Sequence, residues 1–470
     1  MDIIEKKVDE FKDDLVKSVQ ELIRIKSVKS EPKPGMPFGE GTNQALEYML
    51  DLSEKLGFKT KNVDGYAGHA EYGEGEDIVG VLVHLDVVPE GTGWTYPPYG
   101  GEIHSGKIYG RGAIDDKGPA AAALYALKAL KESGAEMKRR VRIIFGIDEE
   151  SGWADMDYYL KKEEIPMCGF SPDADFPIIN SEKGIIKFKM EKAFTPDNKG
   201  IGVEYIKGGL RVNMVPDYCE AKLIIRDKKA GELLKTKYNA FTKNTDNRLE
   251  LIPESEPDKF IIKAYGISAH GSTPEKGINA VIQLLKFLRT VEGIDSDVFS
   301  FISFITEKIG TEVNGESLGI DFEDEISGKL IFNLGVIDFD EKQGMIEINI
   351  RYPIKFTCEE VMTKIKEHTS KEGIQITDVS DNPPLYVPED NFLINKLKKV
   401  YTEVTGQKAE LISIGGGTYA RAIENAVAFG PLFPGKPELA HEKDEYIEIE
   451  DLILSTKIYA KALFELASNI

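Results

Sequence analysis

The N-terminal segment repeats apolar positions at helical spacing and then breaks at a Pro- and Gly-rich stretch. Apolar side chains recur every three or four residues, at Ile4, Val8, Phe11, Leu15, Val19 and Leu22. This spacing predicts an amphipathic helix whose apolar face packs on a core. The loop EPKPGMPFGEG follows, and a second helix is predicted to end at Gly57, because glycine is a common helix stop.

Two largely apolar runs indicate the interior of the next region. Residues 78–83 have the sequence IVGVLV, and a continuous apolar run of this length is typical of a strand covered on both faces of a parallel sheet. Residues 141–147 have the sequence VRIIFGI and predict another buried strand. Between them a helix is predicted to begin near Pro119, since proline is well tolerated in a first turn. Strand, helix and strand in this order predict an α/β fold with a mixed, mostly parallel sheet flanked by helices.

The pattern changes at about residue 184, where apolar and polar residues begin to alternate. Runs such as GIIKFKMEKAF and MIEINIRYP predict strands with one solvated face, as in antiparallel sheets. We therefore expect an α/β domain, residues 1–185 and 385–470, that is interrupted by a large α+β insertion, residues 186–384. The segment PESEPD at 253–258 is expected to divide the insertion into two sub-parts.

The composition narrows the choice of partners. The chain of 470 residues has 59 Lys and Arg against 80 Asp and Glu, a formal net charge of −21. Nucleic acids and anionic membranes bind clustered Lys and Arg, so neither is an expected partner. The cysteines, Cys168, Cys219 and Cys358, form no CxxC pair, which excludes a disulfide framework and a thiolate metal cage. The N-terminus lacks the apolar core of a signal peptide, so a cytoplasmic location is expected.

Some of the acidic residues lie where a binding site can form, beside a histidine at a strand end. His84 and Asp86 follow the first apolar run, and ligands of α/β sheets collect beyond the carboxyl ends of strands. A neutral imidazole there can bind a divalent metal ion while the aspartate orients it. The HxD pair alone is equally compatible with a structural His–Asp contact.

Two acidic pairs and one further aspartate extend this group. Asp115 and Asp116 lie in a Gly-rich loop before a helix, where helix capping explains them as well as metal binding does. Glu149 and Glu150 follow the second apolar run; packing explains this pair poorly, so we expect one metal ligand and one general base. Asp173 follows a proline, where aspartate is also ordinary in turns.

Together these side chains form a set of nitrogen and oxygen ligands without thiolates. Such a set suits Zn²⁺, Mn²⁺ or Co²⁺. A carboxylate shared by two metal ions would give a hydrolytic site that activates water. The residues therefore predict a metal-dependent hydrolase.

The motifs that carry these residues follow one another along nearly the whole chain. They are HLDVVP, GRGAIDDKGP, DEESG, SPD, SAHGSTPEKGINA and AHEKDE. In this order they resemble the motif set of the dinuclear zinc aminoacylase/carboxypeptidase/dipeptidase family, over about residues 10 to 465. RVNMVPD and GGGTYAR resemble the PepV-like dipeptidases within that family. The resemblance implies a metallopeptidase with a catalytic metal-binding domain and an inserted lid.

The resemblance implies two divalent metal ions per chain, Zn²⁺ in the first place and Mn²⁺ or Co²⁺ as alternatives. Asp115 would bridge the two ions. His84 and Asp173 would complete one metal site, and Glu150 and His441 the other.

The resemblance also implies the residues of catalysis. Glu149 would act as general base and then protonate the leaving amine. Asp86 would hold the imidazole of His84, and the peptide bond between Asp115 and Asp116 would be cis.

In the lid, the resemblance implies residues that contact the substrate. His270 would stabilise the oxyanion of the tetrahedral intermediate. Asn213 and Arg351 would hold the substrate, since a guanidinium group suits a free C-terminal carboxylate; the alternative for Arg351 is a surface arginine paired with an acid. The loop that would receive the carboxylate end of the substrate comprises Gly415, Gly416, Gly417 and Thr418. The histidines that match no ligand motif are His69, His104 and His368.

We therefore expect a cytoplasmic enzyme that hydrolyses dipeptides with a free N-terminus, through a metal-bridging water activated by Glu149. The partner is then a small peptide substrate, and a monomer is expected because the long insertion would take the place of a partner subunit. A carboxypeptidase or an N-acyl-amino-acid deacylase of the same family is the main alternative. A non-catalytic peptide- or metal-binding protein is the remote one.

Overall fold

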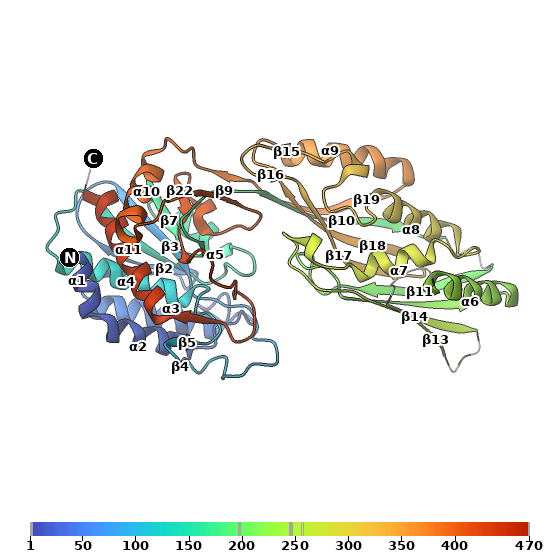
Figure 1. The fold of residues 1–470 in the computed structure, drawn as a ribbon, viewed down its shortest axis with the longest axis horizontal. Coiled ribbons are helices and arrows are strands. Elements are labelled where there is room, and N and C mark those ends of the chain that lie inside the picture. The colour runs from blue at the N-terminus through green and yellow to red at the C-terminus, as the bar shows by residue number, and fades with distance from the viewer. Residues whose placement is uncertain (1–2, 196–198, 244–247, 255, 257, 469–470) are drawn as a thin grey trace. The chain divides into compact units, whose positions relative to one another are not determined.

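The computed structural model describes residues 3–195, 199–243, 248–254, 256 and 258–468, which form two compact units (Figure 1). Unit 1 comprises Met1–Ser181, Tyr386–Ser413 and Gly417–Ile470. Unit 2 comprises Glu182–Leu385 and Ile414–Gly416. The sequence pattern puts the boundaries at residues 185 and 385; the structure adds a short return of the chain to unit 2 that the pattern does not indicate.

Unit 1 is built on a nine-stranded sheet. Its strands are β1 (Lys59–Val63), β2 (Ala67–Tyr72), β3 (Ile78–His84), β6 (Arg140–Gly146), β7 (Cys168–Ser171), β9 (Ile178–Glu182), β20 (Leu385–Tyr386), β21 (Leu411–Ile414) and β22 (Ala426–Ala428). The order is β1-β2-β6-β3-β7-β22-β9-β20, and β21 pairs with β9. β3 pairs in parallel with β6 and β7, whereas β2 pairs antiparallel with β1 and β6. The predicted mixed sheet is confirmed.

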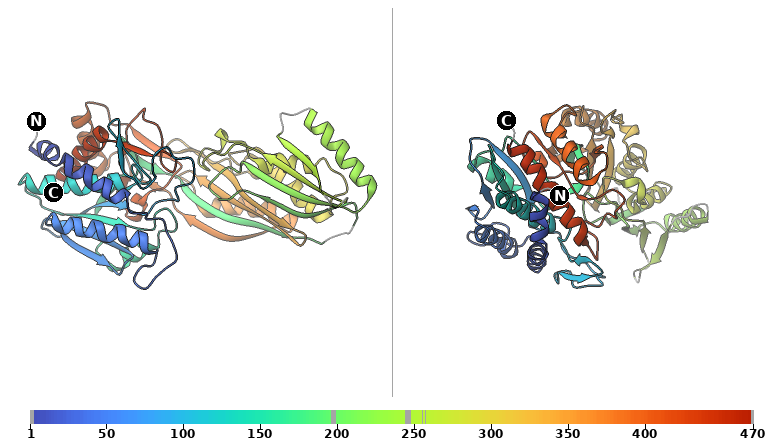
Figure 2. Two further views of the ribbon diagram at one scale, coloured as in Figure 1. Left: turned by 90° about the horizontal axis from the view of Figure 1, so that it is seen from below. Right: turned by 60° about the vertical axis from the view of Figure 1, so that its left-hand side comes forward.

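Helices flank this sheet, as predicted. They are α1 (Ile3–Glu10), α2 (Lys12–Ile23), α3 (Glu40–Lys55), α4 (Lys117–Glu132), α5 (Ala154–Lys162), α10 (Phe392–Thr405) and α11 (Ile449–Ser468). α4 and α11 pack on each other and on β3, while α3 and α5 contact β2. Figure 2 shows α3 on one side of the sheet and α4 and α11 on the other. Because both faces are covered, every residue of β3 is buried, which explains its continuous apolar run.

The N-terminal helix differs from the prediction in one detail. The chain forms two helices, α1 and α2, with Phe11 between them. The N–H of Phe11 donates to the backbone oxygen of Val8 at 3.1 Å, which is the tighter 3₁₀ type of turn. All six apolar positions that predicted the helix are nevertheless buried.

Unit 2 is built on an eight-stranded sheet with the order β13-β14-β12-β11-β17-β18-β10-β19. Its strands are β10 (Gly184–Ala193), β11 (Ile201–Gly208), β12 (Tyr218–Ile225), β13 (Leu249–Pro253), β14 (Lys259–Tyr265), β17 (Ile331–Asp340), β18 (Gln343–Tyr352) and β19 (Gln375–Asn382). The helices are α6 (Lys228–Lys243), α7 (Ala280–Leu288), α8 (Ser296–Lys308) and α9 (Cys358–Thr369). Neighbouring strands pair antiparallel, and alternate residues of β10 are buried, as the sequence alternation predicts.

The segment 253–258 has a different role from the one expected. Residues 255 and 257 of it lie outside the described residues, but β13, which ends at Pro253, and β14, which begins at Lys259, pair antiparallel, with Leu251 opposite Ile262. The strands before and after the segment therefore belong to one sheet and not to two sub-parts of the lid. A Pro-rich run has the same composition in a hairpin connection as in a linker, so composition alone does not distinguish them.

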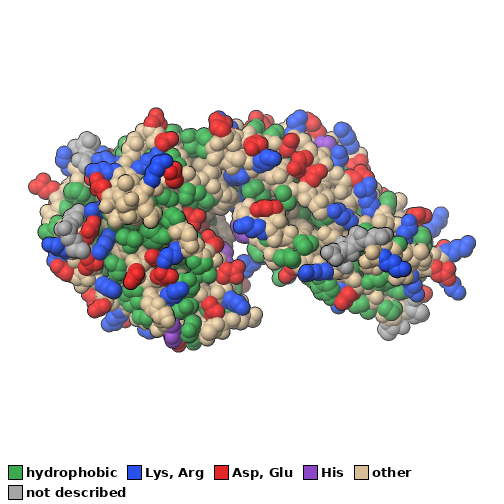
Figure 3. Space-filling view, in the orientation of Figure 1, with side chains coloured by type: hydrophobic (Ala, Val, Ile, Leu, Met, Phe, Trp, Pro, Cys, Tyr) green, Lys and Arg blue, Asp and Glu red, His purple; other side chains and the backbone are tan. Residues whose placement is uncertain are grey.

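The surface carries charges of both signs. On the face drawn in Figure 3, acidic and basic side chains are interspersed over both units. No helix in the described part of the chain is long and apolar enough to cross a membrane. The cytoplasmic location stays a prediction.

Candidate metal centre

Three candidate segments follow parallel strands at the centre of the unit 1 sheet. His84 is the last residue of β3, Glu149 and Glu150 come after β6, and Asp173 comes after β7 (Figure 1). In the parallel register His84 is paired with Gly146, the last residue of β6. Because parallel strands end at the same edge of a sheet, strand pairing alone brings these segments together.

Two segments without regular structure contribute the remaining candidates. Asp115 and Asp116 lie immediately before α4, and the peptide bond between them is cis. His441 lies in the loop between β23 (Pro431–Leu432) and β24 (Tyr446–Glu448), with a left-handed backbone φ of 66°. Both segments belong to unit 1.

Asp115 lies between the two histidines. Its Oδ1 is 2.9 Å from Nε2 of His84, and its Oδ2 is 3.2 Å from Nε2 of His441. Nε2 of His441 is also 3.0 Å from Oε1 of Glu150. Nε2 of His84 is 3.6 Å from Oδ1 of Asp173. Each oxygen of Asp115 therefore faces a different imidazole, which is the arrangement expected of a ligand shared by two metal ions.

The spacing of these atoms fits divalent cations. Donor atoms about 2.0–2.2 Å from a tetrahedral Zn²⁺ ion lie about 3.3–3.6 Å from one another. Two groups have ligand atoms within 4.8 Å of each other. One contains His84, Glu149 and Asp173, and the other contains His84, Asp115 and Glu150. The residues present thus fit metal ions with nitrogen and oxygen ligands, and the carboxylate of Glu149 lies among them.

Asp86 fixes both His84 and the glutamate pair. Its backbone oxygen is 2.9 Å from Nδ1 of His84; because a carbonyl oxygen can only accept, Nδ1 donates and Nε2 is left for a metal ion. The carboxylate of Asp86 accepts the backbone N–H groups of Glu149 and Glu150, each at 3.1 Å. The contact expected between Asp86 and His84 is therefore made mainly by the backbone of Asp86.

The second aspartate of the cis pair is a positioning residue rather than a helix cap. Asp116 is the N-cap residue of α4, but its side chain makes no capping hydrogen bond. Its Oδ2 instead accepts the backbone N–H of His84 at 3.1 Å. Its Oδ1 is buried without a hydrogen-bond partner. The capping explanation that the sequence left open for Asp116 is therefore wrong.

The buried charges of the cluster strongly shift one another's pKa. Burial raises the pKa of Glu149 well above its usual range, and that of Asp173 to about 7. Burial also acts to raise the pKa of Asp115, but hydrogen bonds with the two histidines hold it below its usual range. Burial lowers the pKa of His441, yet its contacts with Asp115 and Glu150 outweigh this and raise it to about 11. The cluster therefore retains protons that a divalent cation would displace.

Buried residues around the cluster carry contacts that the sequence did not reveal. Asp155 accepts a hydrogen bond from the hydroxyl of Tyr419, whose ring meets His84 edge to face at 6.2 Å. Arg111 and Glu445 form a buried ion pair of 2.7 Å. These partners are 264 and 334 residues apart, so no local spacing could have indicated them. The only available signal was that Arg111 and Glu445 lie inside motifs already singled out for their acids and histidine.

Arg351, expected to bind the substrate, lies on β18 of unit 2. It is only 5% exposed. Its Nε donates to Oδ1 of Asn349 and its Nη1 to the backbone oxygen of Gly415, both at 3.0 Å. The alternative of an exposed surface arginine is therefore wrong.

The other expected substrate residues are divided between the units. Gly415 and Gly416 belong to unit 2, whereas Gly417 and Thr418 belong to unit 1. Thr418 is buried, and its hydroxyl oxygen accepts the N–H of Ala420 at 3.2 Å.

His270 and Asn213 lie in neighbouring segments of unit 2. The N–H of Gly271 donates to the backbone oxygen of Asn213 at 2.7 Å. The His270 ring is exposed, with Nδ1 2.6 Å from the hydroxyl of Ser272.

The remaining histidines lie outside the candidate metal groups found in the described residues. His69 is buried, its Nδ1 is 2.7 Å from the hydroxyl of Tyr159, and burial lowers its pKa to about 4. His104 contacts Glu102 at 2.8 Å. His368 is partly buried on α9.

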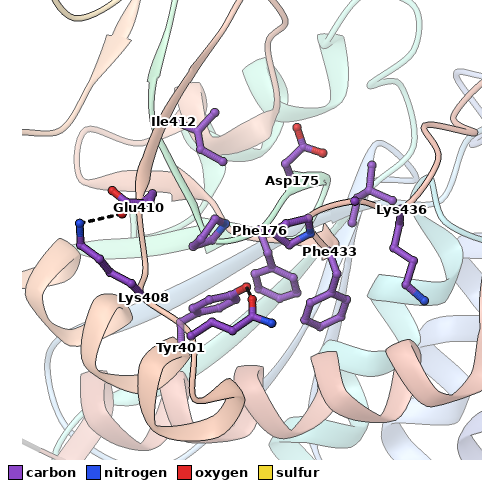
Figure 4. A pocket seen from close by; sticks show the side chains of 13 residues that line it. Asp175, Phe176, Tyr401, Lys408, Glu410, Ile412, Phe433 and Lys436 are labelled. Carbon is purple, nitrogen blue, oxygen red and sulfur yellow. Dashed lines mark hydrogen bonds and ion pairs between the residues drawn. The ribbon is translucent and has the colours of Figure 1, made fainter.

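An apolar hollow of about 520 Å³ on unit 1 is separate from this cluster. Figure 4 shows the rings of Phe176, Tyr401 and Phe433 along it, with the ion pair between Lys408 and Glu410 at one side. No candidate metal ligand lines it. The reactive groups therefore lie in the carboxylate–histidine cluster and not in this hollow.

Comparisons with known proteins agree with this chemistry. The model of peptidase family M20/M25/M40 matches residues 80–465. Putative dipeptidase YtjP of Bacillus subtilis (strain 168) is 48% identical over 462 residues, covering 97% of this chain and 98% of that protein. Putative dipeptidase SAUSA300_1697 of Staphylococcus aureus (strain USA300) is 36% identical over 466 residues, covering 98% of both chains.

A solved structure extends the comparison to the fold. The crystal structure of human carnosine dipeptidase 1 matches with a TM-score of 0.59 at 17% identity and covers 99% of each chain. At that identity the likeness shows the fold alone. The family match and the sequence relatives, by contrast, span nearly the whole chain: the protein belongs to peptidase family M20/M25/M40 and is a metallopeptidase.

Proposed function

We propose that this protein is a dipeptidase that hydrolyses unblocked dipeptides at the cluster around Asp115. The proposal rests on the geometry of this cluster, in which two histidines and several carboxylates converge on a shared aspartate. Over 97% of its length, the chain that carries the cluster is similar to a protein named as a putative dipeptidase.

Two divalent metal ions would be held by residues of unit 1. Asp115 would be the shared ligand, with His84 and Asp173 on one side and Glu150 and His441 on the other. Bound metal ions of this kind polarise a carbonyl group and lower the pKa of water. Zn²⁺, Mn²⁺ and Co²⁺ all suit the ligand set.

Glu149 is the proposed proton carrier. Its carboxylate lies within the group formed with His84 and Asp173, and its backbone N–H is held by Asp86. A carboxylate fixed in this way can accept a proton from the attacking water and deliver it to the leaving amine.

Residues of unit 2 are proposed to bind the substrate. Arg351 would bind the free carboxylate of a dipeptide, since guanidinium and carboxylate groups form paired hydrogen bonds. Its contact with the carbonyl oxygen of Gly415 orients the guanidinium group. Asn213 would contact the substrate, and His270 would donate a hydrogen bond to the oxyanion.

The test is a substrate panel with the purified protein, first stripped with a chelator and then loaded separately with Zn²⁺, Mn²⁺ or Co²⁺. Unblocked dipeptides are expected to be hydrolysed at a higher kcat/KM than the matched tripeptides and N-acetylated amino acids. Preference for N-acetylated amino acids would instead make the protein a deacylase, and release of C-terminal residues from longer peptides would make it a carboxypeptidase. Size-exclusion chromatography with light scattering tests the further proposal that the enzyme is a monomer.

A further inference from the structure

The two proposed metal sites are joined by a buried ion pair that belongs to neither. Arg111 is 2% exposed and Glu445 is fully buried. Nη1 of Arg111 lies 2.7 Å from Oε2 of Glu445. Removing two charges from water is costly unless further hydrogen bonds satisfy them, so the remaining contacts of the pair indicate what it holds.

Glu445 holds the loop that carries Asp115. Its Oε1 accepts the backbone N–H of Ile114 at 3.0 Å and that of Asp115 at 3.3 Å. These are the backbone groups directly before the cis peptide, in a segment without helix or strand.

Arg111 holds the loop that carries His441. Its Nη2 donates to the backbone oxygen of His441 at 3.0 Å, and its Nη1 donates to that of Glu442 at 3.2 Å. The planar fork of the guanidinium group can reach the carboxylate and both carbonyl groups at once, which a lysine ammonium group cannot do in the same geometry.

His441 needs such a support more than His84 does. Its backbone is left-handed, its side chain is 46% exposed, and no helix or strand fixes it. Yet its Nε2 must stay close to Asp115, from which it is 3.2 Å away. A ligand on a loop is placed accurately only if its supporting contacts are rigid.

We infer that the Arg111–Glu445 pair is the positioning device that sets the distance between His441 and Asp115 and thereby the affinity of the second metal site. This inference rests on the proposed metal centre. In the described residues Arg111 contacts neither His84 nor Asp173 of the first site, so the effect of changing it is expected to fall on one of the two metal ions.

The test compares Arg111→Met and Arg111→Lys with a matched control. The control is Arg142→Met, because Arg142 on β6 is itself buried and forms an ion pair, 2.6 Å from the partly buried Glu71, but contacts no proposed ligand in the described residues. Metal binding is measured by titrating chelator-stripped protein with Zn²⁺ and with Mn²⁺ against a competing chelator. Thermal unfolding of the stripped proteins is measured in parallel.

We expect Arg111→Met to lower the affinity for one of the two metal ions by about tenfold to a hundredfold. The affinity for the other ion should stay within about threefold of the wild type. Arg111→Lys, which keeps the charge but not the fork, should give a smaller loss at the same site. Arg142→Met should lower thermal stability without changing either affinity. If both affinities in Arg111→Met and Arg111→Lys equal those of the wild type, or fall together, the inference is overturned.

A failure of the proposed function can be distinguished from a failure of this inference. Wild-type protein that binds two metal ions but hydrolyses no dipeptide would refute the dipeptidase assignment, while the titrations would still decide the role of Arg111. Wild-type protein that binds fewer than two metal ions would overturn the inference itself.

Discussion

The two histidines of the proposed metal centre are held in opposite ways. His84 ends a buried strand, is itself 1% exposed, and is fixed by the backbone oxygen of Asp86 and the carboxylate of Asp116. His441 lies on a loop, is 46% exposed, and depends on the distant Arg111. One half of the site is therefore built by the sheet and the other by long-range polar contacts, so the two halves should respond differently to substitution.

The largest effect is expected from the proposed proton carrier, which lies in the sheet-built half. Glu149→Gln keeps the shape of the side chain but removes its ability to accept a proton. We expect kcat for dipeptide hydrolysis to fall by about 10²–10⁴, because general base catalysis contributes a factor of this size. Steady-state kinetics with the metal-loaded enzyme measure it, and metal titration checks that both ions still bind. A variant with unchanged kcat would remove Glu149 from the mechanism.

Alanine substitutions of the two histidines distinguish the two halves of the site. In the metal-free protein, His84→Ala should lower the free energy of unfolding by about 3 kcal/mol or more, because it leaves buried carboxylates without their partner. His441→Ala should lower it by less than His84→Ala does, since the imidazole is 46% exposed and water can replace part of its contacts. Urea unfolding in the presence of a chelator measures both. Equal losses would contradict the difference in support between the two histidines.

A histidine outside the metal centre provides a pH control. Burial lowers the pKa of His69 to about 4, from an ordinary value of about 6.5, so the unfolded chain binds a proton at higher pH than the folded protein does. The stability that depends on neutral His69 is therefore fully present above about pH 6.5, and it is lost as the pH falls toward 4. Between pH 7.5 and pH 5 the loss should be about 2 kcal/mol.

The measurement is the difference in unfolding free energy between wild type and His69→Gln at the two pH values. Titration of the carboxylate cluster is common to both proteins and cancels in this difference. A pH-independent difference would show that His69 is not held neutral in the folded protein.

The smallest effect is expected at the outer edge of the His441 loop. Asp444 accepts hydrogen bonds from the backbone and the hydroxyl of Thr95, at 2.6 and 2.8 Å. Its φ is 57°, a conformation that asparagine also tolerates. Asp444→Asn should therefore cost less than about 1 kcal/mol of stability. In a chelator titration the affinity of the second metal site should stay within about threefold of the wild type. A larger loss would show that Asp444, rather than Arg111, is the main support of the loop.

The sequence predicted the sheet-built half of the site better than the loop-built half. The apolar runs that became β3 and β6 located His84 and Glu150 at strand ends, because buried strands leave a local pattern. His441 has no such pattern and was found only through a family resemblance. Its support, the contact with Arg111, joins residues far apart in the chain and depends on the folded structure.

Some differences from the prediction have the same physical origin. The capping explanation for Asp116 failed because its carboxylate is turned to the backbone of His84, a tertiary contact. Segment 253–258 has the composition of a divider, and composition does not show that β13 and β14 pair across it. Local sequence patterns thus predict the helices and strands. The contacts between polar groups that are far apart in the chain are visible only in the folded structure.

The most direct test of the proposed metal centre is anomalous diffraction from crystals of the protein loaded with Zn²⁺ or Mn²⁺. We expect two metal peaks per chain, about 3.5–4 Å apart, one at the Nε2 atom of His84 and one at that of His441, with Asp115 bound to both. A single peak, or metal ions bound away from Asp115, would contradict it.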